Sequence, residues 1–114
     1  MDQTLKSELR REHDALIAGT DGRGHLLEAD PQANQHLAET IDLSVANLKA
    51  TGDKRQLGAL NIAILEYEGG LLIAGPTATG NVGILTSTTT NLGLLLNRVR
   101  RLLVSLRGEA SNDG

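Results

Sequence analysis

The sequence contains no cysteine, and Tyr67 is the only aromatic side chain among its 114 residues. The absence of cysteine excludes a disulfide framework and a thiolate metal site, which fits a reducing compartment. The scarcity of aromatics leaves almost nothing for stacking on nucleic-acid bases, and it requires a core of Leu, Ile, Val and Ala. With 14 acidic against 11 basic residues, the chain also lacks the positive field that attracts nucleic acids. We therefore expect no nucleic-acid partner.

Long apolar runs are missing as well. No run approaches the ~18 residues of a membrane span, and the first twelve residues, MDQTLKSELRRE, are too charged for a signal peptide. We therefore expect a cytoplasmic protein that does not insert into membranes. The length suits one core, so we expect a single domain over residues 1–108. The small polar residues 109–114 are expected to form a disordered tail.

The first half of the chain shows a helical pattern, two short apolar runs and a second helical pattern. Residues 3–14 predict a charged helix, and strands are expected near 15–20 and 25–29 around the turn DGRG. In the second helix Asp30 is expected to cap the first turn, with Pro31 at the first helical position. Glycine is expected to end this helix at Thr51-Gly52.

Three further strands and a leucine-rich helix follow. In LGALNIAILEYE, three large apolar residues (Leu60, Ile62 and Ile64) alternate with Asn61, Ala63 and Leu65, which predicts a strand. The runs LLIAGP and NVGILTST predict the next two strands, and capping threonines open a last helix that ends at Gly108. The order αββαβββα predicts an α+β sandwich with one antiparallel sheet.

The segment GPTATGNVG, residues 75–83, has the glycine spacing of a phosphate-binding loop. Such a loop needs Lys and then Ser or Thr after its second glycine, but Asn81 and Val82 stand there. The residues that follow, ILTST, alternate like a strand where a phosphate loop would open a helix. We therefore predict a β-hairpin connection in which Pro76 ends the preceding strand.

This element order resembles the Roadblock/LC7 family from about residue 10 to residue 107. The matching stretches are LIAGTDGRGHLLEAD and LNIAILEYEGGLLIAGPTATGNVGILTSTTTNLGLLLNRVRRLL. They contain the Asp21-Gly22 hairpin, the Gly69-Gly70 turn between two long strands and the leucine-rich last helix. The resemblance implies a profilin/longin-like sandwich of αββαβββα order, with a five-stranded antiparallel sheet flanked by helices.

The family resemblance further implies a homodimer, in which the third strand lies at a sheet edge and pairs with its copy while the two second helices pack alongside. An apolar edge strand would invite aggregation unless something covered it, which agrees with this expectation. The residues expected at the dimer interface are Leu60, Asn61, Ile62, Ala63, Ile64, Leu65, His36, Thr40, Leu43 and Asn47. Residues Gln35, Glu39 and Leu43 are the candidates for contact with another protein.

The family is similar, in prokaryotes, to the MglB-type partners of small Ras-like GTPases, which bind the GTPase as dimers and promote its switching. Eukaryotic relatives are dynein light chains and scaffold subunits for Rag-type GTPases. The resemblance therefore implies a homodimeric, non-catalytic regulator or scaffold of a small Ras-like GTPase, with GTPase activation as one form of regulation. MglB-type partners reposition the machinery of the GTPase itself, so the resemblance brings no catalytic residue and no cofactor to this chain. The alternatives are a dynein-light-chain-like structural adaptor and, in another class, a small-ligand sensor or enzyme with a pocket between sheet and helices.

Several of these residues also have a purely structural interpretation. Leu43 would be a scattered surface leucine, and Leu65 and Tyr67 would take part in ordinary sheet packing. The arginines of the last helix spread around its polar arc, which predicts a solvated face; these are Arg98, Arg100, Arg101 and Arg107.

Metal binding and hydrolysis have weak support in the sequence. Metal ligands would have to come from residues without the spacing of a known metal motif, namely His25, Glu28, Asp30 and His36. No G-x-S-x-G elbow occurs, and no Ser lies near a His in sequence. We therefore expect neither a metal site nor an enzyme.

Overall fold

The computed structural model describes residues 3–87 and 91–108, and within them the predicted element order is confirmed. The elements are α1 (Gln3–His13), β1 (Leu16–Thr20), β2 (Leu26–Ala29), α2 (Gln35–Lys54), β3 (Ala63–Tyr67), β4 (Gly70–Pro76), β5 (Asn81–Thr86) and α3 (Leu92–Gly108). The expected tail, residues 109–114, and the capping threonines at 88–90 lie outside the described residues.

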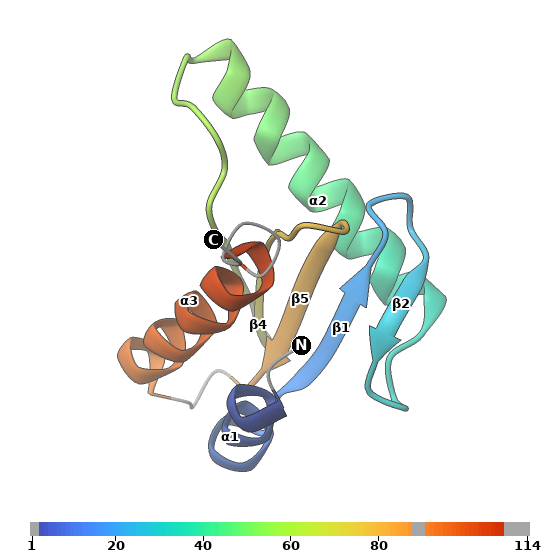
Figure 1. Ribbon diagram of the computed structural model, residues 1–114, viewed down its shortest axis with the longest axis vertical. Helices are drawn as coiled ribbons and strands as arrows, with labels where there is room; N and C mark the ends of the chain where they lie inside the picture. The colour runs from blue at the N-terminus through green and yellow to red at the C-terminus, as the bar shows by residue number, and fades with distance from the viewer. Residues whose placement is uncertain (1–2, 88–90, 109–114) are drawn as a thin grey trace.

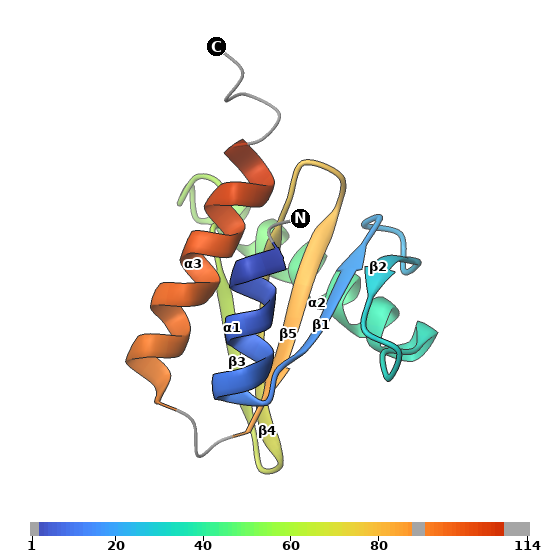
Figure 2. The same ribbon diagram turned by 60° about the horizontal axis from the view of Figure 1, so that its bottom comes forward.

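The five strands form one antiparallel sheet in the order β2-β1-β5-β4-β3. Figure 1 labels β2, β1, β5 and β4, and Figure 2 labels β3 as well. Helix α2 covers one face of this sheet, here named the α2 face. Helices α1 and α3 lie side by side on the opposite face, named the α3 face (Figure 2). Strands β2 and β3 are the two edges, which confirms the predicted edge position of the third strand.

Aliphatic side chains fill the space on both faces of the sheet. On the α3 face, strand residues such as Ile73 and Ile84 pack against α1 and α3, where Leu9 and Leu102 are fully buried. On the α2 face, Ile41 and its neighbours on the helix pack against β1 and β4. Burying large aliphatic side chains stabilises the fold by about 1.5–3 kcal/mol each, which compensates for the missing aromatics.

The start of α2 differs from the prediction. Asn34, not Asp30, is the N-cap, because its side-chain oxygen accepts a hydrogen bond from the backbone N–H of Leu37 at 2.9 Å. The Asp30 carboxylate is occupied elsewhere: it accepts the N–H of Ile17 at 2.9 Å and pairs with Arg10. Residues 31–32 form a turn before the helix, so the prediction of a helical start at proline is wrong.

The end of α2 also differs, because the helix continues through Gly52 to Lys54. The backbone changes direction only at Gln56, which has a positive φ of 57° and donates to the carbonyl of Asp53. A glycine was the expected stop signal, but the chain uses a left-handed glutamine four residues later.

Strand β3 begins at Ala63, three residues after Leu60, where the predicted alternation starts. The segment before it is held differently from a strand, since the carbonyl of Asn61 accepts a hydrogen bond from Arg107 on α3. Leu60 packs into the core of the α2 face and Ile62 into that of the α3 face, so the predicted alternation of these two residues is wrong. Leu65 is partly buried and packs against the core of the α2 face, as expected for ordinary sheet packing.

The GPTATG segment connects β4 to β5 in a hairpin, as predicted. The N–H of Thr77 donates to the carbonyl of Gly80 at 2.8 Å, and the Thr77 hydroxyl accepts from the N–H of Gly80 at 3.1 Å. A strand follows Gly80, so no helix N-terminus is present to bind phosphate.

Candidate protein-interaction surface

The free edge of β3 is the first part of the candidate surface. Tyr67 and Gly70 flank a two-residue turn, and residues that flank such a turn bond to each other. Because bonded pairs alternate along an antiparallel ladder, Ile64 and Glu66 direct their backbone N–H and C=O groups away from β4. The strand therefore presents an open row of donors and acceptors, next to an Ile64 side chain that is 42% exposed.

The outer side of α2 is the second part. Leu43 is 64% exposed there, on the helix surface opposite the buried Ile41 and Val45. His36 and Asn47 are exposed on the same stripe, and Thr40 is half-buried with its hydroxyl bonded to the carbonyl of His36. The structure thus places these predicted residues together on one helix, apart from the β3 edge.

Two of the residues predicted to contact another protein differ in their availability. The side-chain amide of Gln35 donates to the carbonyl of Gly24, which ties α2 to the connection between β1 and β2. Glu39 lies against the same glycine, where an added Cβ would come within 3.2 Å of the Glu39 side chain. Glu39 is nevertheless exposed and its side chain forms no hydrogen bond within the described residues, so Glu39 and Leu43 are better placed for contact than Gln35.

A buried polar cluster beneath α2 was missed from the sequence. The carboxylate of Asp42, only 6% exposed, accepts hydrogen bonds from the Thr20 hydroxyl, the Gly24 N–H at 2.6 Å and the Asn81 amide at 2.7 Å. It thereby joins α2 to the end of β1 and the start of β5. The available signal was an aspartate at helical spacing within the buried stripe that Ala38 and Val45 also occupy.

The predicted solvated arginine face of α3 is wrong for two of its four members. Arg98 pairs with Glu8 and Glu12 of α1, the latter at 2.5 Å, and so connects the two helices of the α3 face. Arg107 folds back onto the sheet, where its Nε donates to the carbonyl of Pro76 at 2.6 Å. Arg100 and Arg101 are exposed as expected.

Arg107 borders a shallow hollow of about 230 Å³ at the start of β3. Burial lowers the pKa of this guanidinium from its ordinary value, although arginine stays charged near neutral pH. Residues Ala59, Leu60, Asn61, Pro76, Thr77 and Ala78 complete the lining.

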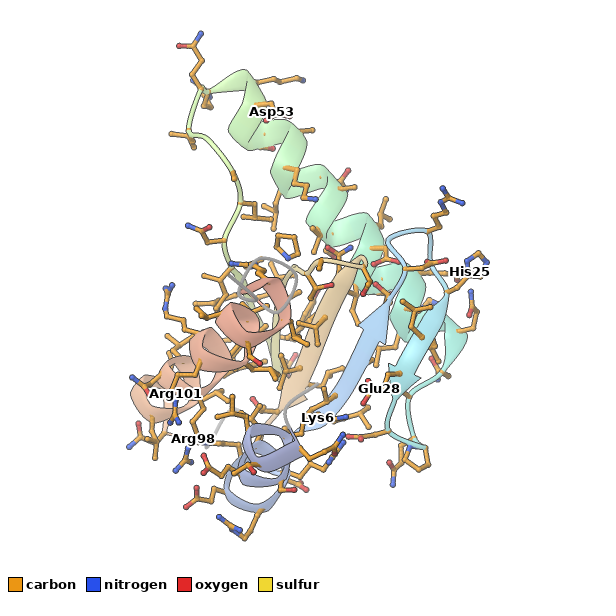
Figure 3. All side chains as sticks on the ribbon, in the orientation of Figure 1. Lys6, His25, Glu28, Asp53, Arg98 and Arg101 are labelled. Carbon is orange, nitrogen blue, oxygen red and sulfur yellow. The ribbon has the colours of Figure 1, made fainter. Side chains whose placement is uncertain are left out.

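A larger cleft of about 390 Å³ lies on the α3 face, between β2, the β4–β5 hairpin and the end of α3. Its lining includes Gly19, Val82, Leu27, Thr79 and Leu106. Figure 3 shows Lys6 of α1 reaching toward Glu28 of β2, and these two side chains pair at 2.6 Å. The Lys6 ammonium therefore lowers the pKa of Glu28.

The four candidate metal ligands do not converge. His25 bonds to Asp21, Glu28 pairs with Lys6, and Asp30 pairs with Arg10, while His36 is exposed on α2. Over residues 3–87 and 91–108, no group of three or more potential ligands is suitably arranged for a metal ion. Within the same residues, no helix has the length and apolar character to cross a membrane.

The comparisons with known proteins find similarity in structure only. No family model matches the sequence, and no curated protein is similar to it in sequence. Among solved structures, the fold is similar to a Roadblock/LC7 domain from Streptomyces avermitilis, with a TM-score of 0.77 at 16% identity over 97% of this chain and 98% of that one. The fold is that of a Roadblock/LC7 domain.

Two MglB structures share this Roadblock/LC7 fold. Myxococcus xanthus MglB has a TM-score of 0.75 at 16% identity and covers 96% of this chain and 90% of its own. A structure described as MglB with a tetrameric arrangement has a TM-score of 0.67 at 20% identity and covers 94% of this chain and 88% of its own. These matches agree with the family resemblance seen in the sequence and extend over nearly the whole chain.

Proposed function

We propose that this chain is a homodimeric, non-catalytic partner of a small Ras-like GTPase, acting as a regulator or scaffold. The observation that carries the proposal is the similarity of the fold to MglB structures over nearly the whole chain, combined with an open β3 edge. The choice of a small Ras-like GTPase as the partner rests on the sequence resemblance to MglB-type partners. The tetrameric arrangement named for one MglB structure supports self-association of this fold.

The dimer forms through the β3 edge. Two copies of this strand pair antiparallel about a two-fold axis, and the two sheets become one sheet of ten strands. Ile64 then loses its exposure, and the open backbone groups of Ile64 and Glu66 gain partners. The two α2 helices lie on the same side of the joined sheet, where Leu43 provides an apolar contact.

The GTPase binds on the α2 side of the dimer, over both second helices and the central strands. Glu39 supplies an exposed, charged side chain there, next to the Leu43 contact between the two helices. This chain contributes no catalytic group; it acts on the partner by holding one conformation of the GTPase. Stabilising one conformation of the GTPase in this way requires different affinities for the GTP-bound and GDP-bound states.

Replacing Ile64 by proline tests the edge pairing, because proline removes an N–H that points to the free edge and edge strands tolerate proline. Ile64→Pro is expected to sediment as a monomer with an unchanged helical circular dichroism signal. Ala63→Pro is the informative comparison, since the backbone N–H of Ala63 bonds to β4. Loss of that hydrogen bond is expected to lower the thermal stability of the monomer. A folded Ile64→Pro variant that remains dimeric would exclude pairing through β3.

The GTPase proposal is tested by presenting the protein with small Ras-like GTPases loaded with GTP or GDP. We expect retention of one nucleotide state on immobilised protein, and a changed rate of GTP hydrolysis or exchange if the chain regulates. Glu39→Arg is expected to weaken retention at least about tenfold, as for loss of a favourable contact and gain of a repulsive one. Equal failure to retain either state of every GTPase tested would overturn the proposal.

The cleft on the α3 face supports a second candidate, a small-ligand sensor. Its volume of about 390 Å³ lies within the range of ligand pockets, and apolar side chains such as Val82 and Leu106 line it. Native mass spectrometry of the purified protein tests this candidate. A bound metabolite that is lost on Val82→Trp substitution would favour it, whereas a mass equal to that of the bare chain would exclude a tightly bound ligand.

A further inference from the structure

Arg107 is a cation without an anionic partner among the described residues. Its Nε donates to the carbonyl of Pro76 and a terminal nitrogen donates to the carbonyl of Asn61. Each bond has a neutral acceptor, and no described carboxylate forms an ion pair with Arg107. A guanidinium has five N–H donors, so donors remain for a carboxylate that approaches from the adjacent hollow.

Carboxylates stand at the opposite end of the same edge strand. Glu66 and Glu68 are exposed, and neither pairs with a described cation. Glu66 opposes Leu71, whose side chain belongs to the core of the α3 face, so Glu66 faces that side of the sheet too. Arg107 lies on the same side, within 3.0 Å of a Cβ added at Gly75.

Two-fold pairing of β3 brings these opposite charges together. In an antiparallel pair of identical strands, the carboxyl end of one strand lies beside the amino end of the other. If Ile64 pairs with Ile64 of the second copy, Glu66 of that copy lies opposite Ile62, one residue from the carbonyl that Arg107 binds. A two-fold axis perpendicular to the sheet also keeps the α3 faces of both copies on one side, so the two side chains share a face.

We propose that Arg107 binds Glu66 of a second copy of this chain, twice in each dimer. The inference rests on the proposed homodimer and adds the register in which its two β3 strands pair. Backbone bonding alone permits several registers along a short edge, because every second residue offers the same groups. Two symmetric ion pairs select the register in which Ile64 meets Ile64, since a slip moves each carboxylate away from its guanidinium.

Charge reversal in two separate chains tests the pairing. The homodimers of Arg107→Glu and of Glu66→Arg each place like charges at both ends of the seam, so each is expected to dissociate at least about tenfold more readily than the unaltered protein. In a mixture, the heterodimer has opposite charges at both ends and is expected to dominate. Native mass spectrometry of the mixture measures the three species directly.

Controls separate this inference from the homodimer and from folding. Arg101→Glu changes the same charge on the same helix at an exposed position and is expected to mix statistically with Glu66→Arg. Urea unfolding of each variant shows that the monomer is folded. A monomeric unaltered protein would overturn the homodimer itself, whereas a stable dimer with statistical mixing of Arg107→Glu and Glu66→Arg would overturn only the ion pair. Preferred mixing with Glu68→Arg instead would assign another register and overturn this one.

Discussion

Two glycines determine how closely separate parts of the chain approach. A Cβ added at Gly80 would lie 2.1 Å from the carbonyl oxygen of Thr20, where the β4–β5 hairpin crosses the end of β1. A Cβ at Gly83 would lie 2.4 Å from the Ile41 side chain, where α2 packs on the sheet. The second glycine of the GPTATG segment therefore serves packing between backbones.

Replacing Gly80 by alanine is expected to lower the free energy of unfolding by about 2 kcal/mol or more, because backbone atoms must move to admit the methyl group. Gly69→Ala is the matched control, since a Cβ there meets nothing within 4 Å. Urea denaturation of both variants measures the difference. Equal midpoints for the two would show that the contact with Thr20 does not limit residue 80.

The Asp42 carboxylate is expected to contribute more to the free energy of unfolding than a single hydrogen bond would, because it accepts hydrogen bonds from three donors in three segments. Asp42→Asn retains the shape but puts an amide N–H₂ against at least one donor, at a cost of about 2 kcal/mol. Asp53→Asn provides the control on the exposed end of the same helix. Thermal unfolding should separate the two variants, and an unaltered midpoint for Asp42→Asn would contradict the role of the cluster.

Helices α1 and α3 are held together by charge as well as by their apolar sides. Arg98 of α3 pairs with Glu8 and Glu12, and one of its terminal nitrogens lies 2.9 Å from Nε2 of the buried His13. A neutral imidazole accepts a hydrogen bond from Arg98, whereas a protonated imidazole would be repelled by the positive charge of the Arg98 guanidinium. Burial first, and then the Arg98 charge, lower the pKa of His13 below 6.5, and Glu12 opposes them.

This contact predicts that stability falls on mild acidification. The unfolded chain protonates His13 near pH 6.5 but the folded chain does so only at lower pH, so the full stability is present above 6.5 and is lost as pH falls. The lowered pKa values of Glu28 and Asp30 act in a more acidic range. His13→Gln is expected to reduce the difference in free energy of unfolding between about pH 7.5 and about pH 5.5. An undiminished difference would assign the pH dependence to other groups.

The elements that follow a clear period were predictable, and those fixed by distant side chains were not. The second helical pattern of the sequence predicted α2. Asp30 does not cap this helix, because its carboxylate binds Arg10 and the N–H of Ile17, which lie elsewhere in the chain. The segment before β3 likewise has a distant partner, since the carbonyl of Asn61 accepts a hydrogen bond from Arg107, 46 residues further along the chain. Local patterns contain no information about such partners.

Large exposed apolar side chains lie on different surfaces of the molecule, and only some of these surfaces belong to the proposed dimer interface. Leu43 on α2 is 64% exposed. Leu27 is 59% exposed and lies on β2, at the edge of the sheet away from β3. Only Leu43 lies on the surface that we assign to the dimer. Leu43→Gln is therefore expected to raise the dimer dissociation constant about tenfold, which corresponds to about 1.4 kcal/mol of lost apolar burial. Leu27→Gln is the control of similar exposure, and sedimentation equilibrium compares the two. A larger effect for Leu27 would move the interface to the β2 edge.

The candidate surface was predictable in outline only. The alternation around Ile64 and the exposed Leu43 were visible in the sequence, and the structure places the first at a sheet edge and the second on the outer side of α2. The Arg107 contact was not visible, because periodicity on α3 says nothing about which strand a long side chain reaches. Asp42 was recoverable in principle, as a charged residue in an apolar stripe.

The strand order also constrains the route by which this chain folds. Strands β3, β4 and β5 are joined by short connections, so their pairing closes only small loops and can form early. Strand β1 joins the same sheet through β5, and Thr20 and Asn81 meet across 61 residues. We therefore expect the β1–β5 seam to form after the rate-limiting step, so Ile17→Val should accelerate unfolding and leave the folding rate nearly unchanged.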